Sequence, residues 1–202
     1  MKYYKYFLLS LGVIFLDQIV KLLVHFNMYI GEEFPVIPGL DFFKIHYTVN
    51  PGMAFGWEIG GDYGKLFLTL FRLVAMVGIA WYLIRLAKKD THPGMLWSIA
   101  LILGGAIGNV IDSTFYGILI DGNVIHDAPM AWFHGQVIDM FYIDICYCYF
   151  PEWVPVFGGQ RHALWPIFNI ADASIFVGVA IILIGQKKFF KEKEEEKVEV
   201  GS

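Results

Sequence analysis

The chain has 202 residues, of which 57% are hydrophobic and 17% are charged, and its mean hydropathy is +0.56. A soluble domain of this length has about 45–50% apolar and about 25% charged residues. The composition therefore excludes a disordered, collagen-like or disulfide-stapled protein and disfavours a water-soluble enzyme. The net charge of −4 gives no support for nucleic-acid binding, and two cysteines are too few for a disulfide framework. The excess of apolar residues is expected to lie in lipid.

Four apolar stretches are long enough to cross a bilayer, which takes about 20 helical residues. The first stretch carries Asp17 and Lys21, and the second carries Arg72. Their predicted bounds are residues 6–26, 66–86, 95–111 and 168–184. The sequence thus predicts an all-α membrane protein with four transmembrane helices in one domain over residues 1–186. The charged tail, residues 187–202, is predicted to be a solvated helix extension or disordered.

The positions of Lys and Arg predict the orientation of the chain in the membrane. Ten of these residues lie at the N-terminus, between the second and third spans, or after the fourth span. Only Lys44 and Arg161 lie in the two long loops, with Lys65 at a boundary. Both termini are therefore predicted to be cytoplasmic and both long loops extracytoplasmic. A cleaved signal peptide is the alternative for the first span, but no A-x-A site follows it and Asp17 interrupts it, so we favour an uncleaved span.

Both long loops are expected to have structure of their own. Residues 34–55 hold short apolar pieces broken by Pro and Gly, which predict a small β-rich extracytoplasmic unit. The long extracytoplasmic loop between the third and fourth helices, residues 112–167, is rich in Trp, Tyr and Phe. These side chains are typical of the lipid headgroup level. A loop of this length is usually functional or folded.

Ionisable side chains inside a span need a reason, because each costs about 2.5–3.5 kcal/mol at the bilayer centre on insertion scales. Asp17 and Lys21 are four residues apart and lie on one helix face. They form either a simple intrahelical ion pair or part of a cluster that holds other polar groups, and the sequence leaves both possibilities open. In the third span, Gly104 and Gly108 form a small-xxx-small face that lets another helix approach closely.

An Asn-x-x-Asp pattern occurs at the outer end of both the third and the fourth span, as Asn109 with Asp112 and as Asn169 with Asp172. One copy alone is as often a helix cap as a site, but two copies at the same membrane depth indicate a shared polar site. Another carboxylate, Asp139, lies among apolar residues between them. Given the predicted orientation, all of these groups fall at the outer interface.

Two aspartates from separate elements can hydrolyse a peptide bond without a metal. Two carboxyl groups about 3 Å apart cannot both ionise, so they share one proton, with the charged group acting as base and the neutral group as acid. Asp172 can be paired with either Asp139 or Asp112, and the residues alone do not choose between them. A Ser–Lys arrangement is weaker, since Lys21 is the sole lysine at a suitable depth. A metal site is also disfavoured, because the available side chains lack zinc spacing: His126, His134, His162, Cys146 and Cys148.

Five motifs in this order resemble the bacterial lipoprotein signal peptidase (type II signal peptidase) family. They are Asp17-Gln-Ile-Val-Lys21, Asn50-Pro-Gly-Met-Ala-Phe-Gly56, Gly104-Gly-Ala-Ile-Gly-Asn-Val-Ile-Asp112, Val137-Ile-Asp139-Met-Phe and Phe168-Asn-Ile-Ala-Asp172. The resemblance implies an intramembrane aspartyl endopeptidase that removes signal peptides from diacylglyceryl-modified prolipoproteins at the outer face of a bacterial cytoplasmic (inner) membrane. It implies cleavage before the lipidated cysteine, with no cofactor and no metal. It also implies a strand-rich first loop and a membrane-lying loop helix, and we expect a monomer that contacts membrane lipids.

The resemblance also implies roles for individual residues. It assigns catalysis to Asp139 and Asp172. It assigns support of the site or substrate binding to Asp17, Lys21, Asn50, Gly52, Asn109, Asp112, Asn169 and Ala171.

Two departures from the family pattern stand out. The family usually has an arginine immediately after the aspartate of the third span, where this chain has Ser113, and Arg161 is the speculative substitute. The segments between Asp112 and Asp139 and between Asp139 and Asp172 are longer than the family pattern leads us to expect.

The alternative from another class is a small proton-coupled carrier that uses intramembrane aspartates. A carrier usually has inverted repeats and polar groups at the midplane, whereas here the acids gather at one face.

Overall fold

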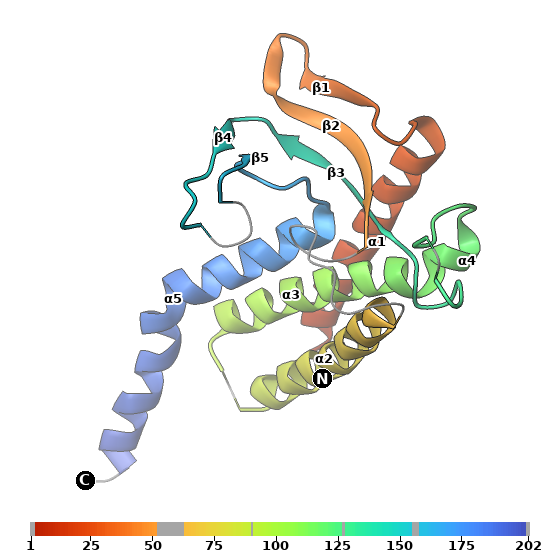
Figure 1. Cartoon of the computed structure of the whole chain (residues 1–202). Coiled ribbons are helices and arrows are strands. Elements are labelled where there is room, and N and C mark those ends of the chain that lie inside the picture. Colours follow the sequence, from red (N-terminus) through yellow and green to blue (C-terminus); the bar gives the residue numbers. More distant parts are fainter. Residues whose placement is uncertain (1–2, 52–62, 90, 127, 155–157, 201–202) are drawn as a thin grey trace.

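The structure is a computed structural model, which describes residues 3–51, 63–89, 91–126, 128–154 and 158–200 (Figure 1), without the side chains of residues 162 and 190–200. Gly52, one of the predicted site residues, lies outside the described residues. Within them, four helices are long and apolar enough to cross a membrane. These are α1 (Tyr4–Asn27), α2 (Gly64–Ala87), α3 (Pro93–Ile111) and α5 (Ile170–Val200). The four predicted spans are thereby confirmed as helices.

The last helix differs from its prediction at both ends. It begins at Ile170 rather than at residue 168, because the backbone of Phe168 is hydrogen-bonded to Phe141 in a strand. At its other end α5 continues through the charged residues to Val200, so the tail is a helix extension (Figure 1). The boundary between domain and tail at residue 187 is not marked by a break in this helix and stays a prediction.

Helix α3 lies between the other helices, contacts α1, α2 and α5, and is the most buried span (Figure 1). Glycines on two of its faces make this close packing possible. A Cβ on Gly104 would lie 2.9 Å from the backbone oxygen of Ser10 on α1, and a Cβ on Gly105 would clash with the backbone oxygen of Ala171 on α5. The predicted small-residue face is therefore a helix contact. In contrast, α1, α2 and α5 expose many large apolar side chains, as expected of surfaces that face lipid.

Replacing Gly105 by alanine is expected to lower the free energy of unfolding by about 1–3 kcal/mol, because the added methyl group must push α5 away from α3. Gly78 on α2 is the matched control, since a Cβ there meets nothing within 4 Å. Alanine at Gly78 should be neutral or stabilising by up to about 1 kcal/mol. Thermal unfolding in detergent measures both variants, and equal stability of the two would show that the α3–α5 contact is not tight.

The strands form a small sheet, one strand of which contacts α1 and the turn that follows α3. Strands β1 (Glu33–Ile37), β2 (Leu40–Asn50) and β3 (Val137–Ile143) make a three-stranded antiparallel sheet in the order β1-β2-β3. A second, two-stranded sheet pairs β4 (Tyr147–Tyr149) with β5 (Arg161–Ala163). The β-rich unit predicted for the first loop is confirmed, and its third strand comes from the second loop. That pairing joins the two long loops into one structure.

The second loop begins as a continuation of α3. A π-helical turn, Asp112–Tyr116, leads into the short helix α4 (Gly117–Leu119), and the loop then returns along β3. Turns of this kind inside helices occur frequently at functional sites. Apart from this π-helical turn and α4, the described residues of the two loops contain no helix. The membrane-lying loop helix implied by the resemblance stays a prediction, and residues 52–62, 127 and 155–157 of the loops are not described.

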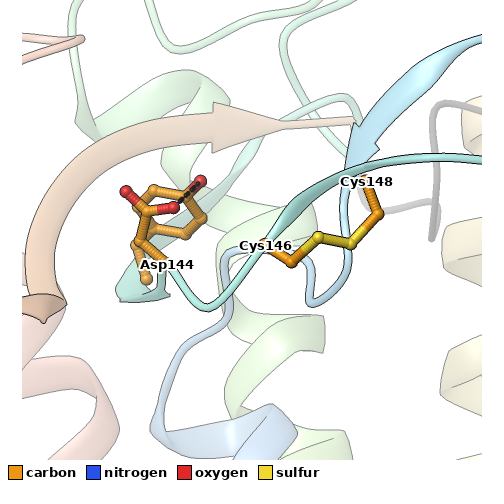
Figure 2. Close-up of a disulfide and its surroundings, with 4 residues drawn as sticks. Asp144, Cys146 and Cys148 are labelled. Carbon is orange, nitrogen blue, oxygen red and sulfur yellow. Dashed lines mark hydrogen bonds between the residues drawn. A yellow bond between two sulfur atoms is a disulfide. The ribbon is translucent and has the colours of Figure 1, made fainter.

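Cys146 and Cys148 are joined by a disulfide next to β4, with their Cα atoms 5.2 Å apart (Figure 2). Only one residue lies between the two cysteines, so the disulfide closes a very tight ring. The backbone oxygen of Cys146 accepts a hydrogen bond from Leu164, so the disulfide lies where the strand leading into β4 meets the chain leaving β5. Asp144, also shown in Figure 2, accepts a hydrogen bond from the Tyr142 hydroxyl at 3.2 Å.

Candidate active site

Four chain segments meet beside the C-terminal end of α3 and bring the predicted site residues together. Asp139 lies on β3, and Asp172 lies in the first turn of α5. Asn50 is the last residue of β2, and Asn109 lies in the last turn of α3. The backbone of Phe168 is hydrogen-bonded to β3 immediately before α5 begins, and this fixes the start of α5 against the strand that carries Asp139.

Asn169 caps α5 and contacts both aspartates. Its Oδ1 accepts a hydrogen bond from the backbone N–H of Asp172 at 2.9 Å, and its own N–H lies 3.4 Å from Asp172 Oδ2. This reciprocal pattern is a capping box, so the cap interpretation of Asn-x-x-Asp holds for this copy. The Nδ2 of the same Asn169 donates to Asp139 Oδ1 at 2.6 Å. One residue thus caps the helix and links the two carboxylates, so the two interpretations of the motif are compatible.

Asp139 is almost fully buried, with 1% of its surface exposed, and both of its carboxylate oxygens accept hydrogen bonds from amides. Asn169 donates to Oδ1, and Asn50 Nδ2 donates to Oδ2 at 2.7 Å. The pKa of Asp139 is raised to about 7, mainly by burial and to a smaller extent by the negative charge of Asp172. The hydrogen bond from Asn50 has the opposite effect and lowers this pKa. A carboxyl group with such a pKa can hold a proton near neutral pH.

Asp172 is half-buried and faces an open cavity, unlike Asp139. Its Oδ1 accepts a hydrogen bond from Asn109 Nδ2 at 2.8 Å, while Asn109 Oδ1 accepts from Lys21 Nζ at 3.0 Å. An ammonium group can only donate, so the oxygen of Asn109 must face Lys21 and its NH₂ group must face Asp172. Lys21 therefore acts on Asp172 indirectly, by fixing the orientation of an amide.

The predicted ion pair of Asp17 and Lys21 is part of a larger buried cluster. Lys21 Nζ lies 2.8 Å from Asp17 Oδ2 and 2.7 Å from Asp112 Oδ2, and all three side chains are 0% exposed. Asp17 Oδ1 also accepts a hydrogen bond from the backbone N–H of Ala171 at 2.9 Å, in the first turn of α5. Asp112 is thus held by a lysine, whereas Asp139 and Asp172 are linked through Asn169.

Gln18 and Lys65 belong to the same region, although the sequence reasoning gave them no role. Gln18 Nε2 donates to Asp112 Oδ1 at 2.8 Å. Lys65 Nζ donates to Ser113 Oγ at 3.1 Å and to the backbone oxygen of Pro51, the residue after Asn50. The sequence does contain a sign that Lys65 faces the site. Lys65 precedes Arg72 by seven residues, which places both on one face of the helix.

Two expectations about charged residues are therefore wrong. Lys21 is not the sole candidate lysine for a Ser–Lys arrangement, since the buried Lys65 contacts Ser113, which stands where the family has arginine. Arg161 is exposed on β5, apart from the residues that line the cavity, and does not replace that arginine.

The cavity beside Asp172 has a volume of about 650 Å³. Its polar side chains come from three helices and β2, while most of its wall is apolar and comes from the segment between β5 and α5 and from α5 itself. The polar lining residues are Asn50, Arg72, Asn109 and Asp172. The apolar wall includes Leu164, Trp165, Ile167, Phe168, Phe176 and Val177. Such a cavity can take an apolar chain and place one polar bond of it beside carboxylates.

Comparison with known proteins identifies the family. A family model described as "Signal peptidase (SPase) II" matches residues 9–187. A lipoprotein signal peptidase of Amoebophilus asiaticus is 43% identical over 92% of this chain and 79% of its own length. One from Porphyromonas gingivalis is 40% identical over 83% of this chain and 76% of its own length. A solved structure of a bacterial membrane enzyme, obtained by the in meso method at 2.3 Å resolution, superposes with a TM-score of 0.60 at 28% identity, over 91% of this chain and 88% of that one.

The comparisons give no support to the carrier alternative, since the two relatives described above are named as lipoprotein signal peptidases. The matched region reaches from the first membrane helix to the fourth and includes every element that contributes to the site. This chain therefore belongs to the signal peptidase II family.

Proposed function

We propose that this chain is an intramembrane aspartyl endopeptidase that removes signal peptides from diacylglyceryl-modified prolipoproteins, with Asp139 and Asp172 as its catalytic residues. The observation that carries the proposal is the link between these two carboxylates through Asn169, at the wall of a largely apolar cavity. Below, Asp139 and Asp172 are called the aspartate pair.

The aspartate pair would hydrolyse the peptide bond by direct attack of water. The ionised carboxylate takes a proton from water as the water oxygen attacks the carbonyl carbon, and the neutral carboxyl donates its proton to the carbonyl oxygen. Collapse of the tetrahedral intermediate returns a proton to the leaving nitrogen and breaks the C–N bond. Asn50 covers Asp139 in this structure, so the substrate carbonyl reaches Asp139 when Asn50 moves aside.

The substrate class follows from the walls of the cavity and from the relatives. Trp165 and Phe176 contact each other edge to face, with their ring centroids 5.7 Å apart. Both side chains line the cavity next to Asp172. An apolar wall of this kind suits acyl chains and the hydrophobic part of a signal peptide. The relatives named above are lipoprotein signal peptidases. We propose that cleavage takes place immediately before the lipidated cysteine.

The orientation of the protein is part of the proposal. The excess of Lys and Arg at the termini and between α2 and α3 supports cytoplasmic termini, which places the aspartate pair at the outer face of the cytoplasmic membrane. A fusion of green fluorescent protein to the C-terminus should fluoresce, and a fusion of alkaline phosphatase at the same place should be inactive. The opposite pair of results would reverse the proposed topology.

The decisive experiment compares two synthetic peptides that differ in one group. Both carry the same signal sequence, but only one carries diacylglyceryl on the cysteine. We expect the purified protein to release the signal peptide from the lipidated substrate alone, leaving a product with N-terminal lipidated cysteine that mass spectrometry identifies. Equal cleavage of both peptides would remove the lipid requirement, and cleavage of neither would remove the proposed function.

Replacing Asn50 by alanine is expected to shift the basic limb of the pH–rate profile to higher pH. Its hydrogen bond favours the ionised form of Asp139, so its loss raises the pKa of Asp139 above its value of about 7. A net hydrogen bond of about 0.5–1.5 kcal/mol corresponds to a shift of about 0.4–1 pH unit. Asn27→Ala is the control, because that exposed amide donates to Leu23 on the surface of α1. A basic limb that moves to lower pH contradicts this account of Asp139.

A further inference from the structure

Helix α2 carries a polar face toward the site. Lys65, Thr69 and Arg72 follow one another at spacings of four and three residues, which places them on one side of the helix. Lys65 donates to Ser113, and Thr69 Oγ1 donates to the backbone oxygen of Phe133 at 2.9 Å. The other side of α2 exposes large apolar side chains, such as Phe67 and Phe71. The polar face is therefore directed away from lipid and toward the protein.

Arg72 lies on this face and lines the cavity together with Asn50, Asn109 and Asp172. Among the described residues that line the cavity, it is the one with a positively charged side chain. The guanidinium group interacts electrostatically with three carboxylates, most strongly with Asp172, then with Asp112 and then with Asp139. The other cation on this helix face is Lys65, and it repels Arg72.

The charge balance around the site explains why a second source of positive charge is needed. Lys21 is the cation of the neighbouring cluster, and its ammonium group is shared between Asp17 and Asp112. One positive charge there faces two negative charges, so the cluster as a whole is negative, although Lys21 also acts electrostatically on Asp139. A cationic side chain in a span costs about 2.5–3.5 kcal/mol on insertion scales, and such residues usually face the protein interior and mark a functional site.

We propose that Arg72 is a positioning residue that holds the negative charge of the aspartate pair on Asp172 and so leaves the shared proton on Asp139. This inference rests on the proposed function and deepens it, because it decides which aspartate is the base and which is the acid. Asp172 then takes the proton from the attacking water, and Asp139 donates its proton to the substrate carbonyl oxygen.

The surroundings of the two carboxyl groups agree with this division of roles. Asp172 faces the cavity, where water can reach it, and it is the carboxylate with which Arg72 interacts most strongly. Asp139 is buried, with 1% of its surface exposed, whereas Asp172 is half-buried. Burial favours the neutral form of a carboxyl group. The pKa of Asp139, raised to about 7 mainly by burial, fits a group that keeps its proton at neutral pH.

The test is the pH–rate profile of cleavage of the lipidated peptide by three variants. Arg72→Gln removes the positive charge, Arg72→Lys keeps it, and Arg85→Gln removes an exposed arginine that stacks on Trp81 near the other end of α2. In Arg72→Gln, both limbs should move to higher pH, the acid limb by about one unit, because an adjacent cation favours ionised carboxylates. At a pH on the acid limb this means about a tenfold loss of kcat, with KM little changed. Arg72→Lys should keep most of the wild-type profile, and Arg85→Gln all of it.

The possible results separate the role of Arg72 from the proposed function. An Arg72→Gln variant that loses activity equally at every pH, or keeps the wild-type profile, would overturn the role of Arg72 while leaving the peptidase intact. If Arg72→Gln fails to fold, two other variants decide. The pH–rate profile of Arg72→Met, measured at low temperature, should move to higher pH. The profile of Arg72→Lys should stay close to that of the wild type. A wild-type protein that cleaves no lipidated peptide would instead remove the proposed function itself.

Discussion

Replacement of either Asp139 or Asp172 by asparagine is expected to lower kcat by on the order of 10²–10⁴-fold while leaving the protein folded. Asparagine has nearly the same shape as aspartate, but it can neither accept a proton from water nor donate one to a carbonyl oxygen at neutral pH. Both residues are needed, so each single variant should lose about as much activity as the double variant. Release of signal peptide from the lipidated substrate, measured under single-turnover conditions, gives these rates.

The matched control for this substitution is Asp144→Asn. Asp144, shown in Figure 2, follows β3 and is partly exposed. It binds Lys44 at 3.0 Å and accepts a hydrogen bond from the Tyr142 hydroxyl. Its variant should retain the wild-type rate, which would exclude a general effect of removing a carboxylate near this strand. Activity at the wild-type level in Asp139→Asn or Asp172→Asn would disprove the assignment of the aspartate pair.

Replacement of Lys21 by methionine is expected to lower the free energy of unfolding by about 3–5 kcal/mol. The lysine is fully buried, and its loss leaves Asp17 and Asp112 close together without a positive charge between them. It also frees Asn109 to rotate, since Lys21 fixes the orientation of the amide that binds Asp172. The variant should therefore lose activity as well as stability. Unfolding followed by circular dichroism in detergent, together with the cleavage assay, measures the two effects.

Lys44→Met is the corresponding control. Lys44 also binds two carboxylates, those of Glu33 and Asp144, but these ion pairs reach the solvent, since all three side chains are partly exposed. Exposed ion pairs contribute about 0–1 kcal/mol, so this variant should be nearly as stable as the wild type. Adding Asp112→Asn to Lys21→Met removes one of the two unpaired charges and should recover part of the lost stability. If Lys21→Met proves as mild as Lys44→Met, the buried cluster does not hold the site together.

Much of the fold could be predicted because the bilayer imposes strong rules on a sequence. A span needs a long apolar run, so the four helices were visible from composition alone, whereas the charged tail was predicted to be either a helix extension or disordered. The membrane also makes each internal polar group conspicuous, which is why Asp17, Lys21, Asn109 and Asp172 stood out. Their approximate membrane depth then followed from their place along each helix.

The pairing of these groups could not be predicted, because pairing depends on how the helices turn and how the loops pack. The residues alone left Asp112 and Asp139 as equivalent partners for Asp172, and it was the family resemblance that chose Asp139. In the structure Asp112 binds Lys21, whereas Asp139 is joined to Asn169. The contact between β2 and β3, which brings Asn50 to Asp139, joins residues from two loops that are far apart in sequence. Long-range strand pairing of this kind leaves little local signal.

The contact between Lys65 and Ser113 illustrates a further limit of sequence reasoning. Lys65 lies at the boundary of a span, where a lysine is expected to reach the water, and so it gave no reason for attention. The structure turns it inward instead, on the same helix face as Thr69 and Arg72. The spacing of these three residues is the local signal that identifies the face, and it is readable once the start of α2 is known.

Infrared spectroscopy of the detergent-solubilised protein tests the shared proton of the aspartate pair most directly. One pH unit below the Asp139 pKa of about 7, the wild-type spectrum should contain a protonated carboxyl band that is missing from the spectrum of Asp139→Asn. The band should disappear as the pH rises through that pKa. If instead no such band distinguishes the two spectra and both carboxyl groups ionise near their ordinary values of about 4, the aspartates do not share a proton and the proposed chemistry is wrong.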